Sequence, residues 1–140
     1  MNEKKISVLL VDDHQVVRAG FRMLLDSQPF IGSIVDVDRG ELACHEYERQ
    51  RPDVVVMDLS MPGIGGLETI RRLKKQDSQA TVLVYSIHDE SIYVERAIQA
   101  GAKGYVTKNS AAEVLAEAVL AVSQGKRYIE QDILPNIDDF

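Results

Sequence analysis

Short apolar runs alternate with helical patterns along the chain. Residues 6–11, Ile-Ser-Val-Leu-Leu-Val, form a nearly unbroken apolar run, which is typical of a strand covered on both faces by helices. Between residues 15 and 27, Val17, Phe21, Leu24 and Leu25 recur at the spacing of one helical face. We therefore expect a strand that is followed directly by a helix.

The same alternation continues toward the C-terminus. Further strands are expected at residues 33–37, 54–57, 81–85 and 104–106, and further helices at 42–51, around 67–73, around 94–98 and from 110 to 122. Asp36 interrupts the run at 33–37, which places that strand at a sheet edge. Five strands that alternate with five helices predict an α/β fold, a doubly wound five-stranded parallel sheet with helices on both faces. We expect the flavodoxin-like strand order 2-1-3-4-5.

Length and composition narrow the class of protein. The 140 residues fit one domain, and a 45% hydrophobic content excludes disorder. We assign residues 1–125 to this domain and 126–140 to a tail or the start of an interdomain linker. The net charge of -6 argues against a domain that grips nucleic-acid phosphates. The apolar run after Lys4 and Lys5 is too short for a signal peptide or a membrane span, so a cytoplasmic location without membrane contact is expected.

Polar residues that could bind a ligand or take part in a reaction follow the strands. Asp12 and Asp13 come after the first strand and Asp58 after the third, while Ser86 and Lys108 follow the fourth and fifth. Ligands of open parallel sheets bind beyond the carboxyl ends of the strands. If the first and third strands are neighbours, three carboxylates converge, and each pair repels by about 3 kcal/mol at roughly 5 Å. Such a cluster requires cations, and carboxylate and carbonyl oxygens are the ligands that Mg²⁺ prefers.

Simpler interpretations exist for the single residues. Asp13 alone could cap the following helix, and Asp58 alone could be a solvated loop residue. Tyr105 would ordinarily be an edge-strand aromatic that rests on the core. Three glycines lack the dinucleotide-binding spacing and indicate turn geometry: Gly63, Gly65 and Gly66. Three histidines show no mutual ligand spacing, which disfavours a histidine metal site: His14, His45 and His88.

Taken together, these residues resemble the receiver domain of two-component response regulators. The resemblance rests on residues 11–14, Val-Asp-Asp-His, on residues 57–63, Met-Asp-Leu-Ser-Met-Pro-Gly, and on Ser86 and Lys108, and it covers about residues 6–125. Segments 12–20 and 125–129 are similar, more narrowly, to regulators of the NarL/FixJ type, in which a LuxR-type helix-turn-helix output domain follows. We expect this chain to be an isolated receiver without that domain. Many receivers carry Pro after the conserved Lys, whereas Asn109 stands there in this chain.

The resemblance implies a role for each site residue. Asp58 would accept a phosphoryl group from a sensor histidine kinase and become an aspartyl phosphate. Asp13, the Asp58 carboxylate and the Ser60 carbonyl would bind Mg²⁺ directly, and Asp12 would act mostly through water. Lys108 would pair with the phosphoryl oxygens, and the Ser86 hydroxyl would bond one of them.

Tyr105 would then rotate toward the space that Ser86 leaves, which alters the face formed by the fourth helix, the fifth strand and the fifth helix. A homodimer could form on phosphorylation through this face, which carries Arg96 and Lys103. Contact with DNA, and hence control of transcription, would require the missing LuxR-type domain. The chain would be a phosphoacceptor signalling domain that catalyses only its own phosphorylation and dephosphorylation.

Three other functions compete with this prediction. A flavodoxin-like electron carrier is disfavoured because Asp12 and Asp13 stand where its phosphate-binding loop needs amides and hydroxyls. An aspartate-dependent phosphatase would have a second Asp two residues after Asp58, where this chain has Ser60. A degenerate receiver that acts as a constitutive binding module stays open, although every chemical position of the receiver pattern is filled.

Overall fold

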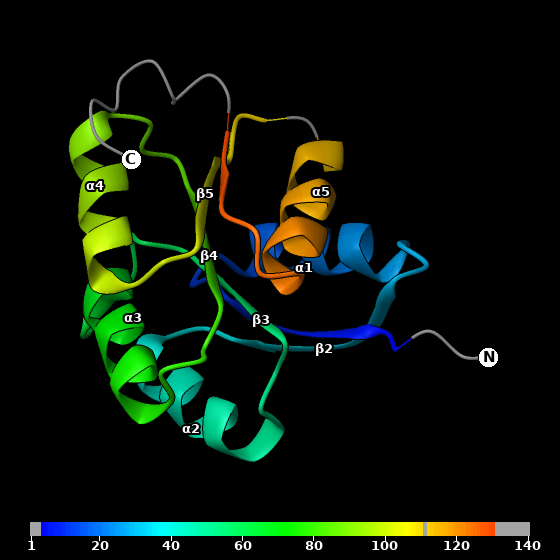
Figure 1. Ribbon diagram of the computed structural model, residues 1–140, viewed down its shortest axis with the longest axis horizontal. Helices are drawn as coiled ribbons and strands as arrows, with labels where there is room; N and C mark the ends of the chain where they lie inside the picture. The colour runs from blue at the N-terminus through cyan, green and yellow to red at the C-terminus, as the bar shows by residue number, and fades with distance from the viewer. Residues whose placement is uncertain (1–3, 111, 131–140) are drawn as a thin grey trace.

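The computed structural model describes residues 4–110 and 112–130, and Figure 1 shows the arrangement of the elements. Strands and helices alternate along the chain as the sequence predicts. Their bounds are β1 (Ile6–Val11), α1 (Gln15–Asp26), β2 (Ile31–Val37), α2 (Gly40–Gln50), β3 (Val54–Met57), α3 (Gly65–Gln76), β4 (Val82–Ser86), α4 (Ser91–Ala100), β5 (Gly104–Thr107), α5 (Ala112–Ser123) and β6 (Tyr128–Ile129).

The strands form one parallel sheet in the order β2-β1-β3-β4-β5-β6. The predicted order 2-1-3-4-5 and the edge position of β2 are confirmed, but the sheet has a short sixth strand that the sequence did not predict. In Figure 1 the segment that follows α5, drawn in orange, runs beside β5. Tyr128 N–H donates to the Lys103 carbonyl at 3.3 Å, and Glu130 N–H donates to the Tyr105 carbonyl at 3.1 Å.

The assigned tail at 126–140 therefore contains sheet residues in its described part. A pair as short as Tyr128-Ile129 has no periodicity that a sequence pattern can reveal. Residues 131–140 lie outside the described residues, and the position at which the domain ends stays a prediction.

Helices cover both faces of the sheet. On one face α2, α3 and α4 pack through residues such as Tyr47, Leu73 and Val94. On the other face α1 and α5 pack through Leu25 and Leu115. Successive residues of β1 and β3 point to opposite faces, so both faces need apolar side chains, which explains why these strands read as unbroken apolar runs.

The helix ends show how local backbone geometry limits each element. The N-cap of α1 is His14 rather than Asp13, and the His14 side chain makes no capping hydrogen bond among the described residues, while its own N–H donates to Asp12 Oδ1 at 2.9 Å. The reading of Asp13 as a helix cap is therefore wrong. Gly101, the predicted terminator of α4, has φ 121° and donates its N–H to the Ala97 and Ile98 carbonyls.

Two glycines near the start of α3 have a positive φ angle. Gly63 and Gly65 have φ of 78° and 77°, which confirms that these two glycines serve turn geometry. Among the residues that the structure describes, no helix combines the length and the apolar character needed to cross a membrane.

Candidate functional site

Three carboxylates meet beyond the carboxyl ends of β1 and β3. The two strands pair in parallel with Val11 opposite Met57, and Asp58 N–H donates to the Val11 carbonyl at 2.9 Å. One ligand atom from each of Asp12, Asp13, His14 and Asp58 lies within 4.8 Å of the others. Asp12 and Asp58 are 2% and 3% exposed. The register of the sheet therefore brings together the acidic residues that the sequence placed at adjacent strand ends.

Lys108 supplies the positive charge of this cluster. Its Nζ lies 2.9 Å from Asp12 Oδ2 and 3.4 Å from Asp58 Oδ2, and its side chain is 11% exposed. Lys108 N–H donates to the Ser86 carbonyl at 2.8 Å, which fixes the residue at the end of β5. Since the described residues contain no cis peptide bond, the bond between Lys108 and Asn109 is trans.

Opposing effects act on the charge of the Asp58 carboxylate. Burial raises the pKa of the Asp58 carboxyl, whereas the charge of Lys108 and the Ser60 N–H bond act in the opposite direction. Ser60 N–H donates to Asp58 Oδ1 at 3.1 Å. Asp58 Oδ2 is buried and, within the described part of the chain, accepts no hydrogen bond, although Lys108 lies at ion-pair distance. The Ser60 N–H thus orients Oδ1 of Asp58, while Oδ2 is left without a hydrogen bond among the described residues.

The cluster also fits a divalent cation. Asp13 Oδ1 is a second buried carboxylate oxygen that accepts no hydrogen bond among the described residues, although His14 Nδ1 lies 3.1 Å from it. Unsatisfied buried carboxylate oxygens are costly, and hard oxygen donors are the ligands that Mg²⁺ prefers. Asp12, Asp13 and Asp58 could therefore hold such an ion, with main-chain oxygens and water completing its shell.

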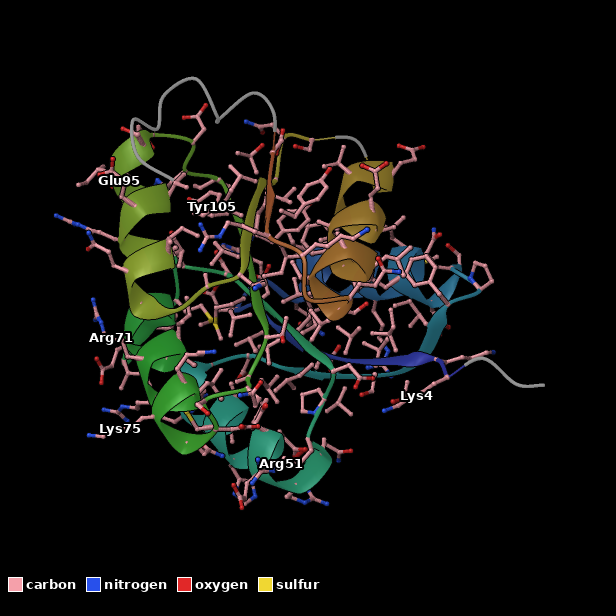
Figure 2. All side chains as sticks on the ribbon, in the orientation of Figure 1. Lys4, Arg51, Arg71, Lys75, Glu95 and Tyr105 are labelled. Atoms are coloured by element: carbon pink, nitrogen blue, oxygen red, sulfur yellow. The ribbon has the colours of Figure 1, made fainter. Side chains whose placement is uncertain are left out.

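Ser86 is the last residue of β4, and Tyr105 lies on the neighbouring strand β5. Ser86 is fully buried, and its Oγ accepts a hydrogen bond from His88 N–H at 3.1 Å. Tyr105 is also fully buried, and its hydroxyl donates to the His88 carbonyl at 2.6 Å. Burial raises the pKa of Tyr105 to about 12, and the neighbouring Ser86 hydroxyl offsets part of that rise. Figure 2 places Tyr105 on the α4 side of the sheet, where its ring joins the core formed with Val94.

Comparison with known proteins identifies this arrangement. The family model of the response regulator receiver domain matches residues 8–120. The chain belongs to this family. The receiver is 39% identical over 137 residues to the transcriptional regulatory protein DegU of Brevibacillus brevis, a match that covers 98% of this chain and 58% of that protein. It is 40% identical over 128 residues to the response regulator UvrY of Escherichia coli K12, covering 91% of this chain and 59% of UvrY.

Solved structures agree with this assignment. A two-component response regulator of the LuxR family from Aurantimonas sp. SI85-9A1 superposes with a TM-score of 0.92 at 36% identity, over 96% of both chains. The resemblance to receivers of NarL/FixJ-type regulators is therefore confirmed. The receiver spans 58–59% of the length of the curated relatives DegU and UvrY.

Two histidines contact the site, although the sequence patterns assigned them no role. His14 Nδ1 lies 3.1 Å from Asp13 Oδ1 and 3.3 Å from Asp12 Oδ1. His88 Nε2 lies 3.0 Å from Ser60 Oγ, and its ring stacks on Tyr93 with the ring centroids 4.2 Å apart. The sequence could have predicted the contact between Ser60 and His88. Ser60 stands two residues after Asp58 and His88 two residues after Ser86, and these site residues follow or end the adjacent strands β3 and β4. His45, the third histidine, is exposed on α2, away from the site.

Proposed function

We propose that this receiver accepts a phosphoryl group on Asp58 from the phosphohistidine of a sensor histidine kinase, in a reaction that depends on Mg²⁺. The observation that carries the proposal is Asp58 Oδ2, a buried carboxylate oxygen without a hydrogen bond among the described residues, 3.4 Å from Lys108 Nζ. Membership of the receiver family supports the reaction class.

The chemistry is a displacement at phosphorus. Asp58 Oδ2 attacks the phosphorus atom, a P–O bond forms, the P–N bond to the kinase histidine breaks, and the bonding pair leaves with the imidazole nitrogen. Asp58 Oδ1 stays oriented by the Ser60 N–H, so the attacking oxygen keeps a fixed direction. Lys108 already lies between Asp12 and Asp58 and can move its Nζ onto a phosphoryl oxygen with little displacement.

The metal contributes charge neutralisation. Asp13, Asp58 and the Ser60 carbonyl would hold Mg²⁺ directly, with Asp12 acting mostly through water, and the ion would offset the negative charge that the phosphoryl group adds to the three carboxylates. Without a cation the cluster of Asp12, Asp13 and Asp58 would repel an incoming phosphoryl group, because Lys108 alone balances one of the three charges.

The response to phosphorylation passes through Ser86 and Tyr105. The Ser86 hydroxyl turns toward a phosphoryl oxygen and gives up its bond from His88 N–H. Because Tyr105 is bonded to the carbonyl of the same residue, the loop that contains His88 links the two side chains. The α4–β5–α5 face then changes, and it controls either a homodimer or, in a longer protein, a LuxR-type DNA-binding domain and hence transcription.

Phosphodonor labelling tests this function. The receiver is incubated with acetyl phosphate and Mg²⁺, and the intact mass is measured. We expect one phosphoryl group on the parent and on the control Asp26→Asn, whose carboxylate is exposed at the end of α1, and none on Asp58→Asn or in excess EDTA. Equal phosphoryl yield on Asp58→Asn would refute the assignment, and absence of label from the parent would favour the constitutive binding module.

A further inference from the structure

One buried carboxylate lies outside the acidic cluster and has no part in the proposed phosphorylation. Glu130 follows β6 and is 9% exposed. Its Oε1 accepts hydrogen bonds from Thr107 N–H at 2.8 Å and from Thr107 Oγ1 at 3.1 Å. A buried carboxylate is costly unless it is paired, and N–H and O–H bonds to an ionised acceptor are the strong ones. Glu130 is therefore held at this position by one residue of β5.

The carboxylate takes the place of a backbone carbonyl in the sheet. β5 and β6 pair in parallel, with Tyr105 opposite Ile129, and Glu130 N–H donates to the Tyr105 carbonyl at 3.1 Å. If the ladder continued, Thr107 N–H would donate to a main-chain carbonyl of the sixth strand. The Glu130 side chain accepts that bond instead, so the last N–H of β5 is satisfied although β6 is only two residues long.

Thr107 is the last residue of β5 and lies between Tyr105 and Lys108 in the sequence. Lys108, which pairs with Asp12 and Asp58, is the next residue, and Tyr105 precedes Thr107 by two. Thr107 also pairs in register with Ser86 of β4. A shift of the Lys108 or Ser86 backbone would move the two donors that hold Glu130, and release of Glu130 would free the end of β5.

We propose that Glu130 is a positioning residue that couples the segment after α5 to the phosphorylation site through Thr107. With Glu130 bound, residues 128–130 cover the free edge of β5 and favour the arrangement in which Tyr105 is buried and Lys108 is directed at Asp58. This proposal rests on the proposed function, because it assigns regulation to the same site. Linkage requires reciprocity: if Glu130 favours the phosphoryl-bound arrangement, a phosphoryl mimic must tighten residues 128–130 on β5.

Two variants at one position and one charge-matched control test the coupling. Beryllofluoride serves as the phosphoryl mimic, and its affinity in the presence of Mg²⁺ is compared among the parent, Glu130→Ala, Glu130→Gln and Glu113→Gln, whose carboxylate is exposed on α5. We expect Glu130→Ala to weaken beryllofluoride binding about fivefold. Glu130→Gln should recover part of that loss, since an amide oxygen can accept from Thr107 N–H, and Glu113→Gln should match the parent.

Two additional measurements separate coupling from general damage. The affinity for Mg²⁺ alone should be unchanged in Glu130→Ala, because within the described part of the chain the hydrogen bonds of Glu130 join it to Thr107 and Tyr105 rather than to Asp12, Asp13 or Asp58. Hydrogen exchange at the amides of Thr107 and Glu130 should be faster in Glu130→Ala and slower in the parent after beryllofluoride is added. Should Glu130→Ala fail to fold, Thr107→Val replaces it and should weaken beryllofluoride binding in the same direction. This variant keeps the Thr107 N–H and removes the hydroxyl, which contacts Glu130 and also Ser110 Oγ at 3.1 Å.

Different experimental results would refute the proposed function and the proposed role of Glu130. A parent protein that does not bind beryllofluoride with Mg²⁺ would refute the proposed function. If the parent binds it but Glu130→Ala and Thr107→Val bind equally well, the coupling is refuted and phosphorylation at Asp58 stands. A loss of Mg²⁺ affinity equal to the loss of beryllofluoride affinity would likewise refute the positioning role.

Discussion

At the level of single residues, the charge of the buried Asp58 carboxylate governs the electrostatics of the site. The carboxylate is 3% exposed and lies close to Asp12, which is 2% exposed, and the single positive charge of Lys108 is shared between the two carboxylates. Burial therefore raises the pKa of Asp58, in contrast to the usual carboxylate that a partner stabilises in its charged form. Burial thus disfavours the charged form of the Asp58 carboxylate, and a bound divalent cation would offset that cost.

Asp58→Asn should therefore stabilise the protein at neutral pH. Because the folded-state pKa is raised, the folded state binds the proton more tightly, so stability falls as pH rises from the unfolded pKa through the folded one, and the full cost is present above both. Asn removes the charge and keeps an oxygen for the Ser60 N–H. We expect a gain on the order of 1 kcal/mol at neutral pH without Mg²⁺, and no gain at a pH below the unfolded pKa. Urea denaturation at several pH values in EDTA measures it.

The control for this measurement is Asp26→Asn, an exposed aspartate on α1, which should shift stability by little at any pH. A less stable Asp58→Asn at neutral pH, or a difference that does not depend on pH, would contradict the electrostatic explanation. Added Mg²⁺ should stabilise the parent more than Asp58→Asn, since the variant loses one charged ligand.

At the scale of elements, the parts that the sequence predicts are those whose burial leaves a pattern. β1 and β3 are buried on both faces and read as apolar runs, and the parallel order follows from the alternation of strands with helices. β6 was missed because its two residues are held by backbone bonds and by Glu130, a contact between distant residues that no local pattern encodes. The bonds of His88 to Ser60 and Tyr105 were missed for the same reason, although the positions of Asp58, Ser86 and Lys108 follow from strand ends alone.

The packing of α3 on the site gives an element-scale prediction. A Cβ on Gly66, the second residue of α3, would lie 2.4 Å from the Asp58 carbonyl oxygen and 2.6 Å from Leu59 Cα. Both atoms are backbone, so Gly66→Ala must push the start of α3 away from the segment that carries Asp58. We expect a loss of about 1 to 3 kcal/mol in the free energy of unfolding, together with slower phosphodonor labelling. Denaturant titration and intact-mass kinetics measure the two effects.

Gly20→Ala is the matched control for the same substitution in a different helix. A Cβ on Gly20 in α1 would meet no heavy atom within 4 Å among the described residues, so only helix propensity changes. This variant should gain up to about 1 kcal/mol of stability and label at the parental rate. If both variants shifted stability in the same direction, the close approach of α3 to Asp58 would not be the cause.

On the scale of the whole molecule, the proposed function places phosphorylation at the carboxyl ends of the strands and the response to it at one edge of the same sheet. The carboxyl ends of β1, β3, β4 and β5 carry the chemistry, and the free edge of the sheet at β5 and β6 faces outward beside α4 and α5, as Figure 1 shows. We expect a change at Asp58 to reach that edge through one strand, β5, because Tyr105, Thr107 and Lys108 all lie on it or directly after it. Under the proposed function, a phosphoryl group on Asp58 and the α4–β5–α5 face would be linked by this one strand.

The chain by itself should not bind DNA in a sequence-specific manner. Its net charge is -6, so the domain as a whole repels phosphates, and affinity for DNA depends on lysines and arginines that displace counterions while specificity depends on side chains placed in a groove. Each described helix is followed by a strand of the sheet, so the described residues contain no helix-turn-helix unit that could place a recognition helix in the major groove. A mobility-shift titration at about 150 mM salt should show no retarded complex, with or without beryllofluoride and Mg²⁺. An isolated LuxR-type helix-turn-helix domain on its own operator serves as the positive control. A retarded complex that survives excess nonspecific DNA would overturn the view that this chain acts only through contacts with other proteins.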